Sequence, residues 1–348
     1  GVAASLFTAL VVTRLIFNFL TERNILTKLP MMHIIKATKI NFMGAAKPLA
    51  IATTVFAIVA LGFGVTQGKK LFGVDFLGGD STTFSYAQKV DVEKVRAELV
   101  GIGEKDSQIQ YQKDISSGKE NLSVTSSTGS ADKVKSTLAE KFPTAQFKAT
   151  GGFSVGASVG DEIRKSAVIA AICAMFGILA YVAFRYEFSF AIAAIIAVLH
   201  DVLFTIGVFC IANAVSGRQF SATVVAAVLT IIGFSINDKI VIFDRIREDL
   251  KLGMRGTFKE IINLALNQTL SRTIITSGTV FIATMVLFIW GGGAINDFAF
   301  TFLVGIIVGT YSSIFVATVI VLWRSKGEKP QIGAASQVGL QNTESAKV

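Results

Sequence analysis

The sequence has few charged residues. Lys, Arg, Asp and Glu together make up 16% of its 348 residues, whereas a soluble globular protein carries about 25%. Apolar residues reach 52%, and the mean hydropathy is +0.60. This composition argues against a soluble globular protein and predicts a polytopic α-helical membrane protein.

Cysteine and proline are also scarce. The only cysteines, Cys173 and Cys210, both lie inside apolar runs, so the sequence predicts neither a disulfide framework nor a paired-cysteine metal site. Four prolines beside 31 glycines exclude a collagen-like or low-complexity chain. We expect no cofactor and no bound metal.

Long apolar runs are abundant. A membrane-spanning helix needs about 20 mostly apolar residues. Six complete runs meet this requirement, one near the start of the chain and five within residues 165–323: 45–66, 165–184, 188–212, 222–243, 273–290 and 298–323. With residues 1–20 as a further span, we expect about seven spans.

Residues 1–20 also carry the trace of an internal repeat. Five of their positions match the last span in identity or apolar character: Gly1, Ser5, Leu6, Phe7 and Ala9 against Gly309, Ser313, Ile314, Phe315 and Ala317. Parallel repeats of this kind occur in transporters. We therefore expect residues 1–20 to be the last span of a first homologous half, followed by a cytoplasmic linker at 21–44.

The basic residues indicate how the chain is oriented. The formal net charge is +9, and Lys and Arg concentrate in 21–44, 245–272 and the tail 324–348, whereas the short loops 213–221 and 291–297 hold only Arg218. Cytoplasmic loops are enriched in positive residues, so these basic segments are predicted to be cytoplasmic. Nucleic acid is not needed to explain the charge.

Residues 67–160 form the one stretch long enough to fold outside the membrane. Their periodicity alternates between that of strands and that of helices. It predicts strands at 81–86, 108–113, 121–125 and 145–153, with helices at 90–100 and 131–142. The order βαββαβ is that of a ferredoxin-like domain. Because no residues here have acid–base or metal-binding spacing, we expect a periplasmic binding or lever module rather than a catalytic one.

Five ionisable residues lie inside or at the edge of predicted spans, where such groups are costly and point to function: His200, Asp201, Asp238, Lys239 and Arg272. Counted from the cytoplasmic ends, Asp238 and Arg272 lie at a similar depth on neighbouring antiparallel spans. We therefore expect them to form a pair, with Asn237 and Thr276 beside them.

Two interpretations of the Asp238–Arg272 pair remain open. A carboxylate in a low-dielectric site holds a proton, and gives it up when a permanently charged arginine approaches. The same pair can also be a static tie between helices. His200 and Asp201 are likewise either an intramembrane relay or a packing hydrogen bond, and Lys239 is expected to extend its charged end to the membrane surface.

Several motifs, in one order along residues 36–325, resemble those of a single protein-export family. They are Gly73–Gly79, Ser154–Gly160, His200–Asp201, Ile232–Asp238, Phe243–Glu248, Asn267–Thr273 and Gly305–Phe315. The chain resembles the SecD/SecF family of the RND superfamily: its main part is similar to SecF, as in the C-terminal half of a fused SecDF, and residues 1–20 are similar to the last span of the SecD half.

The resemblance implies an accessory of the Sec translocase in the bacterial cytoplasmic (inner) membrane. Such a protein uses the proton motive force to promote late preprotein translocation, without covalent catalysis. The implied partners are a SecD-like half, the SecYEG translocon, YidC and YajC, together with unfolded preprotein, protons and membrane lipids. The family's proton path carries over to Asp238 and Arg272, and with them Asn237 and Thr276.

The chain departs from the family pattern in two places, and two rival functions remain. Lys239 stands where a small or apolar residue is expected, and Ala157 where proline is usual. The rivals are an RND exporter of small molecules or lipids and a purely structural translocon scaffold. Finally, the basic, amphipathic segment 245–270 is expected to lie along the membrane surface, and the tail 324–348 to be disordered.

Overall fold

The computed structural model describes residues 2–23, 38–104, 107–113, 119–185 and 188–330. The chain divides into two compact units, Gly1–Thr38 and Lys39–Val348. In the first unit, a helical stretch runs through α1 (Val2–Phe7), the π-helical turn η1 (Thr8–Val12) and α2 (Thr13–Glu22). The predicted span 1–20 is thus helical over its described residues. Most of the predicted linker, and the tail from residue 331, lie outside the described residues.

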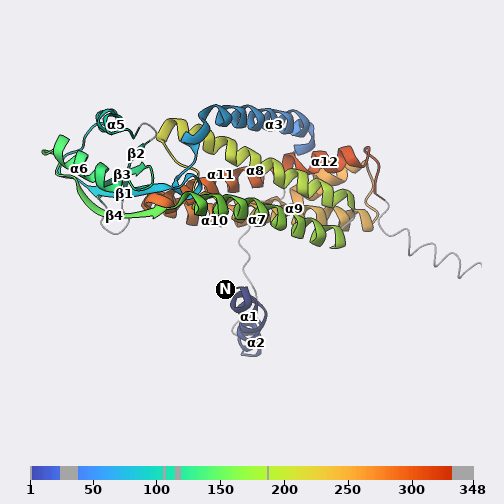
Figure 1. Ribbon diagram of the computed structural model, residues 1–348. Helices are drawn as coiled ribbons and strands as arrows, with labels where there is room; N and C mark the ends of the chain where they lie inside the picture. Colours follow the sequence, from blue (N-terminus) through green and yellow to red (C-terminus); the bar gives the residue numbers. More distant parts are fainter. Residues whose placement is uncertain (1, 24–37, 105–106, 114–118, 186–187, 331–348) are drawn as a thin grey trace, which may run out of the picture. The chain divides into compact units, whose positions relative to one another are not determined.

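The second unit contains a bundle of long helices (Figure 1). They are α3 (Phe42–Gln67), α7 (Ala157–Arg185), α8 (Phe188–Ser216), α9 (Ala222–Lys251), α10 (Phe258–Trp290), α11 (Gly293–Phe315) and α12 (Ala317–Arg324). Within the described part of the chain, six helical segments are long and apolar enough to cross a membrane, with α11 and α12 forming the last of them. The six complete spans predicted from the sequence are confirmed.

A small sheet domain lies at one end of this bundle (Figure 1). It begins after the short helices η2 (Gly68–Leu71) and α4 (Val74–Leu77) and contains β1 (Gly79–Ser85), α5 (Val92–Gly101), β2 (Gln108–Lys113), β3 (Glu120–Ser126), α6 (Ala131–Lys141) and β4 (Lys148–Val155). The strand order is β2-β3-β1-β4, with antiparallel neighbours throughout. The predicted βαββαβ order, with its ferredoxin-like sheet, is confirmed.

One apolar face of the sheet packs on the two helices of the domain. Phe84, Leu122 and Val124 alternate with more exposed residues along their strands, and they meet Val95 of α5 and Leu138 of α6 in one core. The two helices of the domain begin with different caps. At the start of α5, the side chain of Asp91 accepts the amide of Glu93 at 2.8 Å. At the start of α6, Ser130 donates its hydroxyl to the carbonyl of Ser127, and the carboxylate of Asp80 accepts the amide of Ala131 instead.

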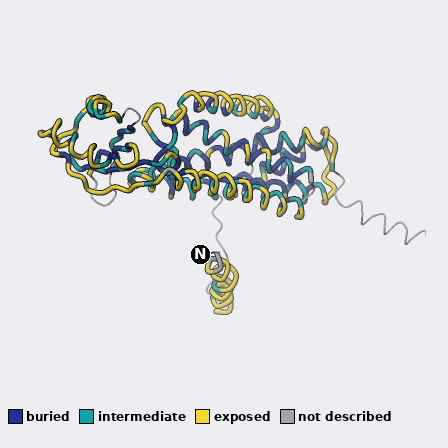
Figure 2. Tube along the Cα trace, in the orientation of Figure 1, coloured by how far each residue is buried: buried dark blue, intermediate teal, exposed yellow. Residues whose placement is uncertain are grey.

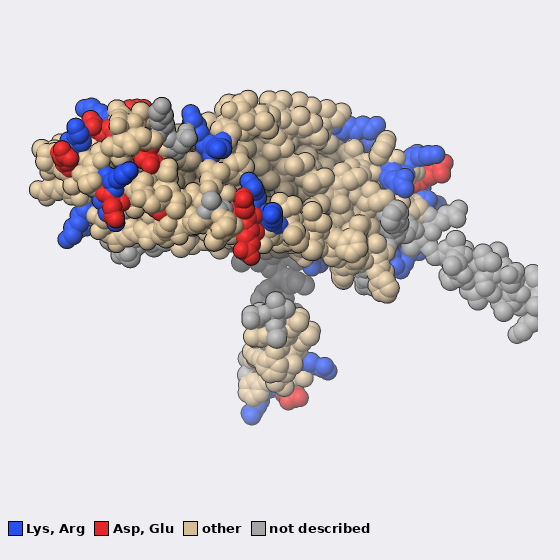
Figure 3. Space-filling model, viewed as in Figure 1, with Lys and Arg blue, Asp and Glu red and all other residues tan. Residues whose placement is uncertain are grey.

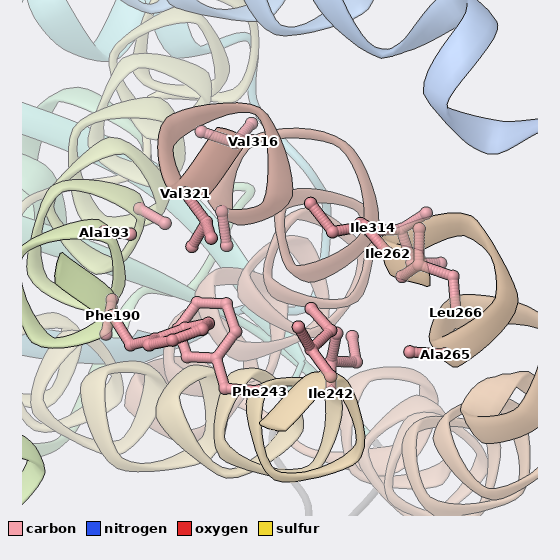
Figure 4. Close-up of a cluster of buried hydrophobic side chains, with 14 of the residues drawn as sticks. Phe190, Ala193, Ile242, Phe243, Ile262, Ala265, Leu266, Ile314, Val316 and Val321 are labelled. Carbon is pink, nitrogen blue, oxygen red and sulfur yellow. The ribbon is translucent and has the colours of Figure 1, made fainter. Parts of the chain in front are cut away.

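The bundle core gathers where α8, α9, α10, α11 and α12 meet (Figure 4). The rings of Phe190 and Phe243 pack there with their centroids 5.2 Å apart. Elsewhere, glycines allow close approach: a Cβ at Gly64 would collide with Cys210, and one at Gly305 with Ile231. Because lipid tails are as apolar as the core, such small-residue contacts are a main source of helix association in a membrane.

Residues 245–270 are not a separate segment: they comprise the end of one helix, a turn and the start of the next. Helix α9 continues to Lys251 and α10 already begins at Phe258, so the connection is a short turn. Gly253 and Gly256 both have positive φ there, and a capping box between Thr257 and Glu260 begins α10. Hydropathy ends a predicted span at its first charges, whereas the backbone hydrogen bonds of the helix continue past them.

The sides of the bundle are apolar. Large apolar side chains are exposed along α3 and α7, including Ile58, Val59 and Phe176, and Figure 2 shows exposed residues along the outer side of α3. On the face drawn in Figure 3, the charged side chains of the unit Lys39–Val348 gather over or near the sheet domain and at the opposite ends of the helices. An exposed apolar surface of this extent marks contact with lipid or another protein. The chain is a multi-pass membrane protein.

Candidate functional site: two polar clusters on helix α9

The first cluster surrounds Asp238 in the interior of the bundle. Asp238 lies on α9 and is 3% exposed. The hydroxyl of Ser277, on α10, donates to its Oδ2 at 3.1 Å. Thr310, on α11, in turn donates to Ser277 Oγ at 2.8 Å. Three helices thus meet at one carboxylate, which accepts a single hydroxyl proton.

Arg272 and Asp238 form no ion pair among the described residues. Arg272 is exposed at the side of α10, five residues before Ser277, which is about 7.5 Å along a helix axis. The structure therefore brings α10 to Asp238 through Ser277, while the guanidinium of Arg272 stands apart from the carboxylate.

The two flanking residues expected at this site have no hydrogen bond to Asp238 within the described part of the chain. Asn237 is exposed on α9. Thr276 is partly buried, and its hydroxyl donates to the carbonyl of Arg272 on its own helix at 2.9 Å. Asn237 and Thr276 are therefore not part of the buried hydrogen-bonded group around the carboxylate.

The second cluster surrounds Asp201 on α8. Asp201 and Lys239 are both 0% exposed, and Lys239 Nζ donates to Asp201 Oδ2 at 2.8 Å. Ser235 of α9 donates to the same oxygen, and so does Ser312 of α11, at 2.7 Å. The cluster joins three helices through one carboxylate oxygen.

The expectation that Lys239 reaches the membrane surface is wrong. Its ammonium is fully buried and has oxygen partners on three sides: Asp201 at 2.8 Å, Ser235 Oγ at 2.5 Å and Ser312 Oγ at 2.9 Å. Extension to the surface is advantageous only when no buried anion is within reach, and Asp201 provides one.

His200 connects this second cluster to α3. Its Nδ1 lies 3.2 Å from Asp201 Oδ1 and its Nε2 lies 3.1 Å from Thr53 Oγ1. An ionised Asp201 would only accept hydrogen bonds, so in that state Nδ1 would be the donor to it. His200 thus makes the interhelical hydrogen bond that was one of its two predicted roles.

The sequence puts the Ser277 hydroxyl on the face of α10 that carries Arg272, but it does not identify Ser235, Thr310 and Ser312 as parts of these clusters. Each lies in an apolar span, and small hydroxyl residues there also serve as packing positions. Ser235 lies four residues before Lys239 and so on the same helix face, which is the one local signal that could have indicated it. The residues from α10 and α11 could be assigned only once the helices were placed.

A separate ion pair links the α8–α9 loop to α11 at the end of the bundle near the sheet domain. Arg218, in the loop between α8 and α9, pairs with Asp297 of α11, and both are mostly buried. The Arg218 guanidinium also lies 4.8 Å from the ring centroid of Phe300.

Nearby, a cleft of about 710 Å³ runs between β2 and α5 of the sheet domain and the ends of α3 and α8. Among the described residues, no group of three His, Cys, Asp or Glu comes together as a metal site.

The helices that carry both clusters match a known family. Residues 133–327 match the family described as "Protein export membrane protein SecD/SecF, C-terminal". The chain belongs to the SecD/SecF family. The matched segment contains Asp201, Asp238, Lys239 and Arg272, so both polar clusters lie in the part of the chain that carries the relationship.

Two relatives in the SecD/SecF family align with most of this chain. It is 40% identical over 296 residues to the protein translocase subunit SecF of Desulfurispirillum indicum, covering 82% of this chain and 91% of that protein. It is 36% identical over 341 residues to the protein translocase subunit SecDF of Thermus thermophilus, covering 96% of this chain and 45% of that one. The chain thus spans most of the SecF relative and less than half of the SecDF relative.

A solved structure shows the same fold. The crystal structure of the translocon-associated membrane protein SecDF from Thermus thermophilus superposes with a TM-score of 0.80 at 35% identity. The match covers 93% of this chain and 44% of that chain. Family, relatives and structure together support a role of this chain in protein export.

Proposed function

We propose that this chain is a SecF-like component of the Sec translocase that uses the proton motive force to promote late translocation of unfolded preproteins. It works beside a SecD-like half and the SecYEG translocon in the cytoplasmic membrane, with YidC and YajC as further partners. Proton uptake and release at Asp238 drive a conformational change, and no covalent step is catalysed. The names of the relatives support the export role, and the geometry around Asp238 supports the coupling.

The observation that carries this proposal is the sparse bonding of Asp238. A buried ionised carboxylate is costly unless it is paired and hydrogen-bonded. Asp238 accepts only from Ser277 and has no ion pair within the described part of the chain. A carboxylate in this setting changes its partners when it gains or loses a proton, which is what a coupling group requires.

Arg272 is the natural counter-charge for the deprotonated state. It remains protonated at all physiological pH values and lies on α10, the helix that already touches Asp238 through Ser277. In the proposed cycle, release of the proton draws Arg272 towards Asp238, and proton uptake allows it to withdraw. One proton that crosses 100 mV releases about 2.3 kcal/mol, enough to change a two-state equilibrium about fiftyfold.

Helix α9 also connects Asp238 to the sheet domain. At the start of α9, the carboxylate of Asp75 accepts the amide of Ala222 at 2.8 Å. Beside it, Gly73 donates its amide to the carbonyl of Phe220 at 2.9 Å, and Phe220 donates to that of Leu71 at 2.8 Å. A tilt of α9 therefore moves the segment that enters β1, which supports the lever role proposed for the periplasmic domain.

The test compares Asp238→Asn with Asp244→Asn in inverted membrane vesicles that contain the natural protein. Asp244 lies on the same helix but is exposed, so its variant controls for the loss of one carboxylate. We expect Asp238→Asn to abolish the stimulation of preprotein translocation by a proton gradient, with ATP-driven translocation and co-purification with the translocon retained.

Two results would contradict the proposal. Unchanged gradient stimulation in Asp238→Asn would leave Asp238 as a structural tie and favour the scaffold function. Equal loss in Asp244→Asn would show that the assay reports net charge and not the site.

A further inference from the structure

Lys239 and Asp201 form a fully buried charge pair that the coupling scheme above does not use. Both side chains are 0% exposed, and the ammonium nitrogen lies 2.8 Å from the carboxylate oxygen. The charged or titratable side chains that face Asp201 are Lys239 from α9 and its neighbour His200 on α8. From α11 it meets only the hydroxyl of Ser312.

The hydrogen bonds of the cluster fit a charged pair. Lysine has three protons to donate, and the acceptors around Lys239 Nζ are Asp201 Oδ2, the hydroxyls of Ser235 and Ser312 and, at 3.4 Å, the carbonyl of Ser235. Both serine hydroxyls lie within donating distance of Asp201 Oδ2, and Ser312 also has the carbonyl of Gly309 as an acceptor at 3.2 Å. A neutral aspartic acid would add a further proton, so at least one of the present donors to Oδ2 would have to change its acceptor.

Asp238 is the opposite case, although it is the preceding residue. Side chains of consecutive helical residues point about 100° apart, so Asp238 faces α10 while Lys239 faces α8. Asp201 lies within hydrogen-bond distance of a cation, two hydroxyls and an imidazole, whereas Asp238 accepts from one hydroxyl. Of these two carboxylates, Asp201 is thus surrounded by several hydrogen-bond partners and Asp238 has one.

We infer that Lys239 is the permanent counter-ion of Asp201, which withdraws Asp201 from proton exchange and leaves Asp238 as the proton-exchanging carboxylate of the two. Lys239 is a positioning residue in this scheme, because it acts through Asp201 and not on the moving proton. The inference rests on the proposed function only where it concerns Asp238; the charge state of the pair is independent of it.

Removing the lysine should create a second proton-binding group. A buried carboxylate that loses its lysine counter-ion either destabilises the fold or takes up a proton and becomes neutral. The variant Lys239→Met keeps the length and apolar stem of the side chain, so Asp201 should become protonated at neutral pH. Removing both charges, as in Asp201→Asn with Lys239→Met, should leave a neutral core that folds.

The experiment is infrared spectroscopy of the intact purified protein in lipid at neutral pH. The carbonyl stretch of a protonated carboxylic acid is compared among wild type, Lys239→Met and the double variant. Lys251→Met, at the exposed end of α9, is the matched control. We expect a carboxylic acid band equivalent to about one group to appear in Lys239→Met, and to be absent from the double variant and from the control.

Comparison of the wild type with the double variant keeps the inference falsifiable if Lys239→Met does not fold. Loss of a carboxylic acid band in the double variant would show that Asp201 is already protonated in the wild type, and the inference would be overturned. A folded Lys239→Met without a new band would overturn it as well.

Translocation measurements separate this inference from the proposed function. The double variant should keep gradient-stimulated translocation within about twofold of wild type, because Asp238 is intact; a loss beyond tenfold would show that Asp201 takes part in proton exchange. If instead Asp238→Asn also retained gradient stimulation, the proposed function would fail, while the infrared result on Asp201 and Lys239 would stand.

Discussion

Asp238 and Lys239 are consecutive residues of α9, yet their charged groups belong to different clusters. Asp238 is bonded to Ser277 of α10, and Lys239 to Asp201 of α8. Helix α9 therefore holds α8 through an ion pair supported by two hydroxyl groups, and holds α10 at this depth through a single hydroxyl. If α9 moves against a neighbour when Asp238 changes its protonation state, the contact with α10 is the one that yields.

Loss of the Ser277 hydroxyl should weaken the coupling. A hydrogen bond to a charged group contributes about 1.5–3 kcal/mol, so we expect Ser277→Ala to lower the gradient-stimulated rate of translocation by about tenfold or more. Ser277→Thr, which keeps a hydroxyl, should retain more activity. Thr279→Ala is the control, because the hydroxyl of exposed Thr279 donates only to the carbonyl of Thr276 on its own helix. Equal rates in Ser277→Ala and the wild type would show that the hydroxyl does not matter.

Asp75→Ala should uncouple the sheet domain from α9. The variant removes the acceptor of the Ala222 amide, and loss of such a cap costs about 1 kcal/mol. We expect gradient-stimulated translocation to fall, with proton binding at Asp238, followed by infrared spectroscopy, unchanged. Asp132→Ala, on the exposed start of α6, controls for a lost carboxylate in the domain. If Asp75→Ala also lost proton binding at Asp238, Asp75 would belong to the proton site and not to the connection between α9 and the sheet domain.

The Arg218–Asp297 pair should behave as a buried ion pair. Removing one partner leaves an uncompensated charge, at a cost of about 3–5 kcal/mol, so Arg218→Met and Asp297→Leu should each lower the midpoint of thermal unfolding. The double variant should recover at least half of that loss. The exposed pair of Arg164 and Asp161 is the control, with an expected contribution of about 0–1 kcal/mol. Additive effects at Arg218 and Asp297 would contradict this prediction.

Acid should destabilise the sheet domain through Asp80. Burial by itself raises the pKa of Asp80, but hydrogen bonds from the hydroxyl of Ser154 and from backbone amides that include Ala131 outweigh it, so the pKa lies below its ordinary value. A carboxylate with a lowered pKa stabilises the folded state above the unfolded pKa, and that stability is lost as the pH falls. We expect the protection of α6 amides from hydrogen exchange in the intact protein to decrease below about pH 4.

The variant Asp80→Ala should remove that pH dependence. Its α6 amides should exchange faster already at neutral pH, by the equivalent of about 1 kcal/mol for a lost cap, and acid should have less further effect. A response to acid as steep as that of the wild type would assign the dependence to another group.

The sequence alone was enough for the architecture and for part of the site. Apolar length predicts spans, and alternating periodicity predicts strands and helices, because both depend on residues close together in the chain. Asp238 and Asp201 could be selected as buried polar groups for the same reason, since a charged residue inside an apolar run is recognisable from the local sequence alone.

Tertiary structure decided which of these groups meet. Whether Asp238 reaches Arg272 or Ser277, and whether Lys239 extends to the surface or turns inward to Asp201, depends on the rotation and depth of whole helices. Those are set by contacts such as Gly305 against Ile231, between residues far apart in the chain. A local pattern carries no information on them, because partners across helices are fixed only when all the apolar faces pack at once.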